Sequence, residues 1–324
     1  MVLHFGKATG IYLKTMPFVL LRMGIGLLLG IVSIVYFGVI GWLAWTFVDA
    51  ETVSGWVAIV ALLIALVVFI KAWQLLVKYV LYLVKAGHIA VIAHIVQTGE
   101  VPSNQISYGT GKVKEHFTEA SALFAVDQVI KAVIKQFNRR VLSFSNLVSF
   151  VPTLKQIIEF VGRAVAIAAS YIDEAIVAYM FISDEENRWK AAGDGLVLYA
   201  KSWKPVLGST LLIVGGMYVA ALVLFLAMTP LASVLSGLST TFEVIGWVVV
   251  AGLVLTVYSG LLKPWVKTVV ITTFLIEAQD KTPDSKTRQQ IENRSEKFKE
   301  LLNRAETEDQ SVEKSEQDSP AATV

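Results

Sequence analysis

The residues with the clearest capacity for chemistry are two adjacent acids, Asp173 and Glu174, in the apolar segment SYIDEAIVAYMF. Ionisable side chains inside apolar sequence tend to face a cavity or a partner, where a carboxylate can bind a cation or exchange a proton. Arg163 lies earlier in the same apolar stretch. Two interpretations remain open: an ion or proton site, or acids that pair with Arg163 or face the cytoplasm from a helix that covers the bundle.

A second group of charges is basic. Lys71, Lys78 and Lys85 recur every seven residues, which places three ammonium groups along one side of a helix that leaves the bilayer. Lys131, Lys135, Arg139 and Arg140 follow in the next polar section. We expect these side chains to contact anionic lipid headgroups at about 1 kcal/mol each, although the usual excess of positive charge on the inner side of a membrane also explains them. No nucleic-acid-binding fold accompanies them, so no nucleic-acid partner is expected.

Motifs for catalysis are missing. The sequence has no phosphate-binding loop, no dinucleotide-binding fingerprint, no nucleophile elbow and no His-Glu-x-x-His motif. It has no cysteine, and its four histidines are not spaced to share a helical turn. The sequence therefore predicts a protein that is not an enzyme and that has no catalytic residue, cofactor or metal site.

The elements that carry these charges alternate with long apolar runs. Hydrophobic residues make up 55% of the 324 residues, charged residues only 17%, and the mean hydropathy is +0.62. Four runs are long enough for membrane spans, and we group them into transmembrane hairpins at 23–70 and 206–262. The predicted spans are 23–48, 53–70, 206–228 and 244–262. The turn of the second hairpin is predicted in the section from Thr229-Pro230 to Thr240, and a stop or kink at Lys263-Pro264.

Charge placement predicts the orientation. The connections 49–52 and 229–243 contain no Lys or Arg, whereas the N-terminal segment 1–22, the middle 71–205 and the segment after 262 contain many. The positive-inside rule therefore predicts a multi-pass protein of the cell membrane with both termini cytoplasmic. The fold class is all-α: a polytopic helical bundle with amphipathic or re-entrant cytoplasmic helices.

The sections outside the hairpins differ in character. Residues 112–138 have the periodicity of an amphipathic helix. Residues 154–182 predict a buried, re-entrant or interfacial helix, with the alternative that they cross the membrane together with 141–151. Residues 263–305 predict amphipathic and charged helices, and 306–324 a disordered acidic tail.

Small residues occur at four-residue spacing in two spans. Gly26 and Gly30 lie in the first span, and Gly216 and Ala220 in the third. Such surfaces allow helices to approach closely. They predict either packing within the four spans or a contact between copies of the chain in a homo-oligomer.

The C-terminal half resembles the choline transporter-like family. The likeness lies in the segment SYIDEAIVAYMFISDEENRWKAAGDGLVLYAKSWKP, two following spans, and AGLVLTVYSGLLKPWVKTVVITTFLIEAQD before a charged helix. The resemblance implies the movement of a solute across a membrane. It assigns no binding residue.

Two functions are therefore expected. The first is a transporter or channel-like assembly for a small solute or ion, which the glycine-lined spans and embedded charges favour. The alternative is a membrane scaffold or adaptor whose cytoplasmic helices bind a partner protein or anionic lipid. Water access to Asp173 or Glu174 at membrane depth would favour transport.

Overall fold

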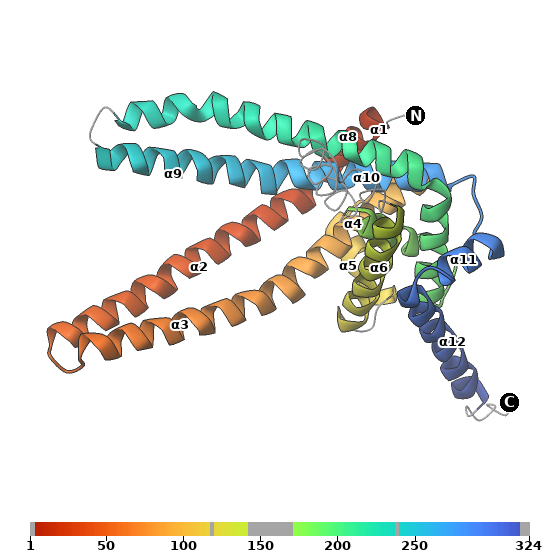
Figure 1. The fold of residues 1–324 in the computed structure, drawn as a ribbon, viewed down its shortest axis with the longest axis horizontal. Coiled ribbons are helices and arrows are strands. Elements are labelled where there is room, and N and C mark those ends of the chain that lie inside the picture. The colour runs from red at the N-terminus through yellow and green to blue at the C-terminus, as the bar shows by residue number, and fades with distance from the viewer. Residues whose placement is uncertain (1–3, 117–119, 142–170, 237–239, 318–324) are drawn as a thin grey trace, which may run out of the picture.

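The computed structural model of the chain describes residues 4–116, 120–141, 171–236 and 240–317, and all regular elements in these ranges are helices. The predicted all-α class is confirmed. Four helical stretches are long and apolar enough to cross a membrane: Met16–Asp49, Gly55–Thr98, Leu212–Pro230 and Val250–Ala278. They form two hairpins that diverge from a common helical base (Figure 1).

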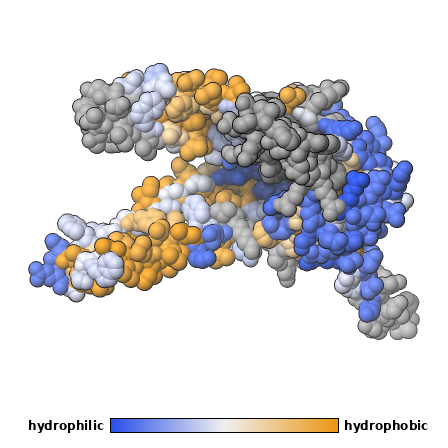
Figure 2. Space-filling model, in the orientation of Figure 1, coloured by the Kyte–Doolittle hydropathy of each residue, from blue (hydrophilic) through white to orange (hydrophobic). Residues whose placement is uncertain are grey.

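The first hairpin follows the short helix α1 (Phe5–Lys14) and consists of α2 (Met16–Asp49) and α3 (Gly55–Leu76). Its large apolar side chains are mostly exposed, with Leu27 at 70% and Ile34 at 74%. Figure 2 shows hydrophobic surface along much of both hairpins and hydrophilic surface over the base. Such exposure is unfavourable in water and favourable in lipid, so it fits helices that lie in a bilayer.

The returning helix of each hairpin continues well past its predicted end. After α3 the chain forms a π-helical turn, η1 (Val77–Leu81), and then α4 (Tyr82–Thr98). After α9 (Thr240–Val257) it forms η3 (Tyr258–Leu262) and then α10 (Lys263–Ala278). The helix predicted to leave the bilayer after residue 70 is present, whereas the helix does not stop at Lys263-Pro264 as predicted. Pro264 does not stop the helix because it lies in the first turn of α10, where a missing N–H costs little.

The turn predicted in the section from Thr229-Pro230 to Thr240 lies at the end of that section, because one helix ends at Ser236 and the next begins at Thr240. A single helix, α8 (Arg188–Ser236), runs from the base into the second hairpin and through both residues. In an unbroken helix the carbonyl of Leu226 would accept from the N–H of residue 230, which proline lacks. The Thr229 hydroxyl donates to that carbonyl at 2.8 Å. The freed acceptor is thus satisfied, and the helix continues.

The base is a packed helical unit. It contains α4, α5 (Gln105–His116), α6 (Ala120–Val141), a helix at 171–180, the start of α8, α10 and α11 (Ser285–Glu292). The predicted amphipathic segment contributes Val113, Ile130 and Val133 to its core, each at most 5% exposed. α4 and α5 approach closely: a Cβ on Gly109 would lie 2.5 Å from the Gly87 carbonyl oxygen. Only glycine fits at that crossing.

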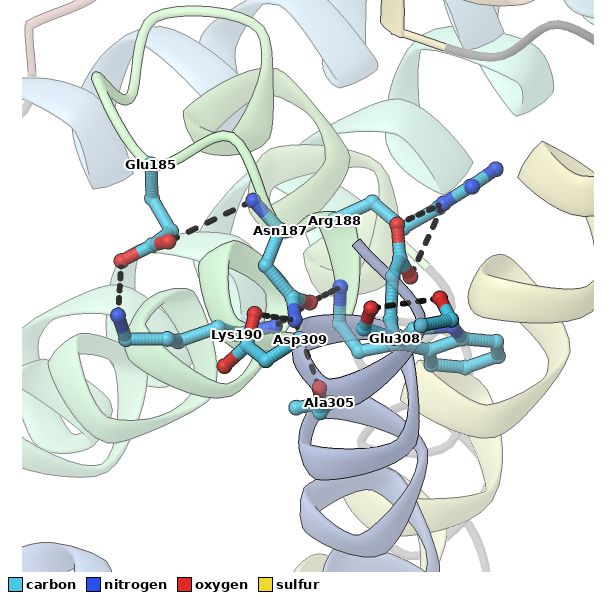
Figure 3. A network of polar contacts seen from close by, with 9 residues as sticks. Glu185, Asn187, Arg188, Lys190, Ala305, Glu308 and Asp309 are labelled. Atoms are coloured by element: carbon cyan, nitrogen blue, oxygen red, sulfur yellow. Dashed lines mark hydrogen bonds and ion pairs between the residues drawn. The ribbon is translucent and has the colours of Figure 1, made fainter. Parts of the chain in front are cut away.

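The C-terminal helix α12 (Glu296–Gln317) is fixed on the start of α8. Asn187 donates to the Ala305 carbonyl at 2.8 Å and to Asp309 at 2.6 Å, and Arg188 pairs with Glu308 at 2.9 Å (Figure 3). The same Asn187 side chain caps α8, because its oxygen accepts from two backbone N–H groups. α12 therefore extends through 306–317, where the sequence predicted disorder.

Candidate functional site

Charged side chains from four parts of the chain converge inside the base. Asp173 and Glu174 lie on the helix at 171–180, and Asp127 and Lys131 lie on α6. Lys85 comes from α4 and Lys267 from α10, the two helices that continue the returning arms of the hairpins. We call these six residues the charge cluster. Fully ionised, its three carboxylates balance its three ammonium groups.

Glu174 joins the two hairpins electrostatically. One of its oxygens, Oε1, lies 2.5 Å from Nζ of Lys267 and 3.2 Å from Nζ of Lys85. The side chain is 5% exposed, so both ion pairs are shielded from water. Its other oxygen, Oε2, is buried with no hydrogen-bond partner among the described residues. A buried carboxylate between two cations is held in its ionised form, and removing either side would leave an unpaired charge.

Asp173 and Asp127 form the second half of the charge cluster. Lys131 Nζ donates to Asp127 Oδ2 at 2.5 Å and lies 3.4 Å from Asp173 Oδ2. Both carboxylates are 1% exposed. Oδ1 of Asp127 and both oxygens of Asp173 are buried without a hydrogen bond among the described residues. One lysine therefore serves two carboxylates, and Asp173 is the less satisfied of the two.

The two adjacent acids differ in their affinity for a proton. Burial, together with the negative charges of Glu174 and Asp127, raises the pKa of Asp173 to about 7. Burial would also raise the pKa of Glu174, but the positive charges of Lys267 and Lys85 outweigh it and lower that pKa. Near neutral pH Glu174 is therefore a fixed negative charge, whereas Asp173 can gain or lose a proton.

A cavity of about 20 Å³ adjoins Glu174 between α2, α4 and α10. Besides Glu174 its polar lining consists of Arg22, Lys85, His88 and Lys267. Its volume is enough for roughly one water molecule. His88 is fixed by a 2.9 Å hydrogen bond to the Thr15 hydroxyl and by stacking on Phe18, with ring centroids 5.3 Å apart.

The site residues predicted from the sequence differ in their surroundings: some are paired inside the base, and others are exposed or lie outside the described residues. Asp173 and Glu174 are buried and paired, but with lysines of other helices; Arg163 lies outside the described residues. Lys85, predicted to contact lipid headgroups, instead pairs with Glu174. The π-turn at Val77–Leu81 breaks the seven-residue register, so Lys71 remains exposed while Lys85 turns inward. The side chains of Lys78, Arg139 and Arg140 are outside the described part of the structure.

The predicted small-residue surfaces do not pack within the chain. A Cβ added to Gly26, Gly30 or Gly216 would meet no atom within 4 Å. Gly216 and Ala220 line an apolar groove of about 350 Å³ between α1, α8 and α10, together with Phe5 and Trp265. These positions therefore face the surroundings of the chain, and the interpretation as packing among the four spans is wrong for the described residues.

Sequence reasoning missed Asp127, Lys267 and Arg22 as site residues. Asp127 could have been identified from the sequence, because it is an acid in an otherwise apolar turn of a predicted amphipathic helix. Lys267 is separated from Glu174 by 93 residues, and no local pattern links them. Lys267 lies three residues after Pro264, which suggested a helix end, so its position inside the base was not predicted.

The site offers proton exchange and charge binding, and no group of three or more His, Cys, Asp or Glu side chains in the described residues is arranged to hold a metal ion. Asp173 can change protonation state, Glu174 couples the two hairpins, and Arg22 adds a positive charge at the cavity. These capacities rest on the geometry alone, because no family model matches the chain, and no curated protein or solved structure is similar to it.

Proposed function

We propose that the chain is a membrane transport protein that moves a small solute or an ion, with proton uptake and release at Asp173 as part of its cycle. The observation that carries this proposal is the position of Asp173. It is 1% exposed, lacks hydrogen bonds to either oxygen among the described residues, and lies where the two hairpins meet. A buried carboxyl group whose pKa lies near neutral pH can take up and release a proton during a transport cycle.

The charge cluster links protonation of Asp173 to the contacts between helices of the base. Neutral Asp173 would release Lys131 to pair with Asp127 alone, whereas ionised Asp173 competes for it at 3.4 Å. Lys131 and Asp127 belong to α6, and Glu174 beside Asp173 is bound to both hairpins. A change of charge at Asp173 would therefore alter the contact between α6 and the helix at 171–180, which also carries the carboxylate paired with both hairpins. The family resemblance of the C-terminal half also favours solute movement.

The scaffold alternative has less support. It relies on the basic face of the cytoplasmic middle, and on the C-terminal helix with its narrow apolar stripe, to dock a partner protein or anionic lipid. Ile291, Phe298 and Leu301 of that stripe are each at most 4% exposed and belong to the core of the base. The stripe is occupied by the chain itself, so a partner would have to bind a polar face.

Flux through liposomes tests the transport proposal. Purified protein is reconstituted with a pH-sensitive dye inside, and cations, anions and zwitterionic solutes are added outside. The wild type should acidify or alkalinise the lumen with at least one solute, and Asp173→Asn should reduce that rate at least about tenfold. Glu100→Gln, which removes an exposed carboxylate, should leave the rate unchanged. No flux above empty vesicles, or equal flux in Asp173→Asn, would reject the proposal.

The proposed topology places the base and both termini in the cytoplasm of a cell-membrane protein. It is supported by the absence of Lys and Arg from the hairpin tips at 49–52 and 229–243. The native chain has no cysteine, so a single introduced cysteine is the one thiol of the protein that a maleimide can label. A membrane-impermeant maleimide added to intact cells should label Thr52→Cys and spare Ser103→Cys. Labelling of Ser103→Cys alone would reverse the orientation.

A further inference from the structure

We infer that the cavity between α2, α4 and α10 binds the phosphate group of an anionic phospholipid, with Arg22 as the principal contact. This inference does not depend on the transport proposal. The cavity collects cations from three helices: Arg22 from α2, Lys85 from α4 and Lys267 from α10. Among the described residues of the lining, Glu174 is the one carboxylate. With all four groups ionised, the lining therefore carries an excess of two positive charges.

Arg22 is the unpaired member of this lining. Glu174 is shared by Lys85 and Lys267, both on the same oxygen. Arg22 has no ion pair or side-chain hydrogen bond within the described residues, and it is only partly exposed. A partly buried guanidinium presents a planar fork of donors that matches a phosphate and binds it through two hydrogen bonds. An anion at this place would complete the charge balance of the cavity.

The position of Arg22 favours a lipid over a free anion. It lies in the second turn of α2 and immediately precedes the uncharged run 23–48, so it marks the level at which that run meets the headgroups. Leu20 and Leu27, on either side of it along α2, are 59% and 70% exposed. Basic pockets between membrane helices at this level are typical headgroup sites.

The size of the cavity also favours a lipid over a free anion. About 20 Å³ admits a single phosphate oxygen beside Arg22, with the rest of the group at the mouth. Phe18, Ile89 and Ile271 supply the apolar walls. A free phosphate would lose hydration against these walls without compensation, whereas a phospholipid keeps its acyl chains in the bilayer and presents only its phosphate.

Native mass spectrometry of the full chain in neutral detergent tests the site. Phosphatidylglycerol and phosphatidylcholine with identical acyl chains are titrated separately, and the bound lipids are counted. The wild type should retain phosphatidylglycerol about tenfold more tightly. Arg22→Gln should weaken that binding about fivefold, the effect of one headgroup charge. Lys114→Gln, which removes an exposed lysine on α5, should change it less than about twofold.

Three results would overturn the inference. The first is equal phosphatidylglycerol binding by Arg22→Gln and the wild type. The second is an equal loss in Lys114→Gln, which would assign binding to the basic surface as a whole. The third is displacement of the lipid by inorganic phosphate at millimolar concentration, which would make the site one for free anions.

A second variant keeps the test valid if Arg22→Gln fails to fold. Arg22→Lys keeps the charge and loses the planar fork, so it should fold and bind phosphatidylglycerol more weakly than the wild type. The thermal unfolding midpoint of each variant without lipid serves as the folding control. Phosphatidylglycerol should raise the midpoint of the wild type more than that of Arg22→Lys, and equal increases would contradict the role of the guanidinium.

Discussion

The two hairpins end in base helices that follow the same plan. In each, the returning arm passes through a five-residue π-helical turn, η1 or η3, before the base helix α4 or α10 begins. Each base helix then carries Val-Lys followed four residues later by Ile, at Val84-Lys85 and Ile89 and at Val266-Lys267 and Ile271. Both lysines reach the same oxygen of Glu174.

The hairpins differ in how closely that lysine is held. Lys267 Nζ lies 2.5 Å from Glu174 Oε1, whereas Lys85 Nζ lies 3.2 Å away. Lys85 has a second neighbour, since its ammonium group lies 5.1 Å from the ring centre of Tyr82. One buried carboxylate, Glu174, therefore joins two similar arms at unequal distances. The second hairpin is bound tightly to the helix at 171–180, and the first more loosely.

Removing the shared carboxylate should have the largest effect. Glu174→Gln leaves Lys85 and Lys267 facing each other without a counter-ion in a shielded place. We expect a loss of about 3–5 kcal/mol in the free energy of unfolding, measured by denaturing-detergent titration in mixed micelles. Glu100→Gln, at an exposed position, should cost less than about 0.5 kcal/mol. A similar small loss in both variants would show that Glu174 does not join the hairpins.

Removing one lysine at a time tests the inequality of the arms. Met replaces the aliphatic stem of lysine but not its charge, so each variant leaves Glu174 with the other lysine. Lys267→Met should lower the free energy of unfolding by about 2 kcal/mol and Lys85→Met by about 1 kcal/mol, in the order of the two distances. The same titration measures both. Equal losses would contradict a looser first hairpin.

The pH dependence of stability separates Asp173 from Glu174. The pKa of Asp173 is raised in the folded chain to about 7 from an ordinary value of 3.8, so its ionisation opposes folding. Stability should therefore increase as pH falls from about 8 to about 5, by on the order of 2 kcal/mol. Glu174, whose pKa is lowered, stays ionised throughout this window. Subtracting the profile of Asp173→Asn isolates this contribution, and parallel profiles would exclude it.

The sequence was sufficient for the helical class, the four apolar helices and the expectation that Asp173 and Glu174 face partners rather than lipid. These features depend on local composition: a run of apolar residues long enough for a bilayer is visible without the fold. Acids embedded in such sequence are equally visible. The division into two hairpins was also visible, because the connections without Lys or Arg lie near the tips.

The helix ends and the partners of Asp173 and Glu174 could not be predicted from local composition. Pro230 and Pro264 looked like terminators, but a hydroxyl of Thr229 satisfies the carbonyl freed by the first, and the second lies in the first turn of a helix. Lys85 was assigned to lipid by a seven-residue spacing that a π-turn interrupts. Lys267 and Glu174 meet only through tertiary packing. Such features depend on side-chain geometry across helices, which periodicity does not contain.

The smallest expected effect concerns the arms of the first hairpin. The Tyr36 hydroxyl of α2 donates to the Ala65 carbonyl of α3 at 2.9 Å, within a cluster of aromatic rings that includes Phe37 and Phe69. Tyr36→Phe keeps the ring and removes this one interhelical hydrogen bond. Because such bonds between membrane helices contribute little on average, the free energy of unfolding should fall by about 0.6 kcal/mol.

Ser33→Ala is the matched control for this variant. It removes a hydroxyl from the same helix, but one that donates at 2.7 Å to the Leu29 carbonyl of its own helix. It should leave the free energy of unfolding unchanged or slightly higher, because such bonds within a helix add little to its stability. A loss in Tyr36→Phe no greater than in Ser33→Ala would mean that the arms of the first hairpin are held by ring packing and lipid alone. The loose attachment of Lys85 at the base would then be matched by an absence of polar contacts along the arms.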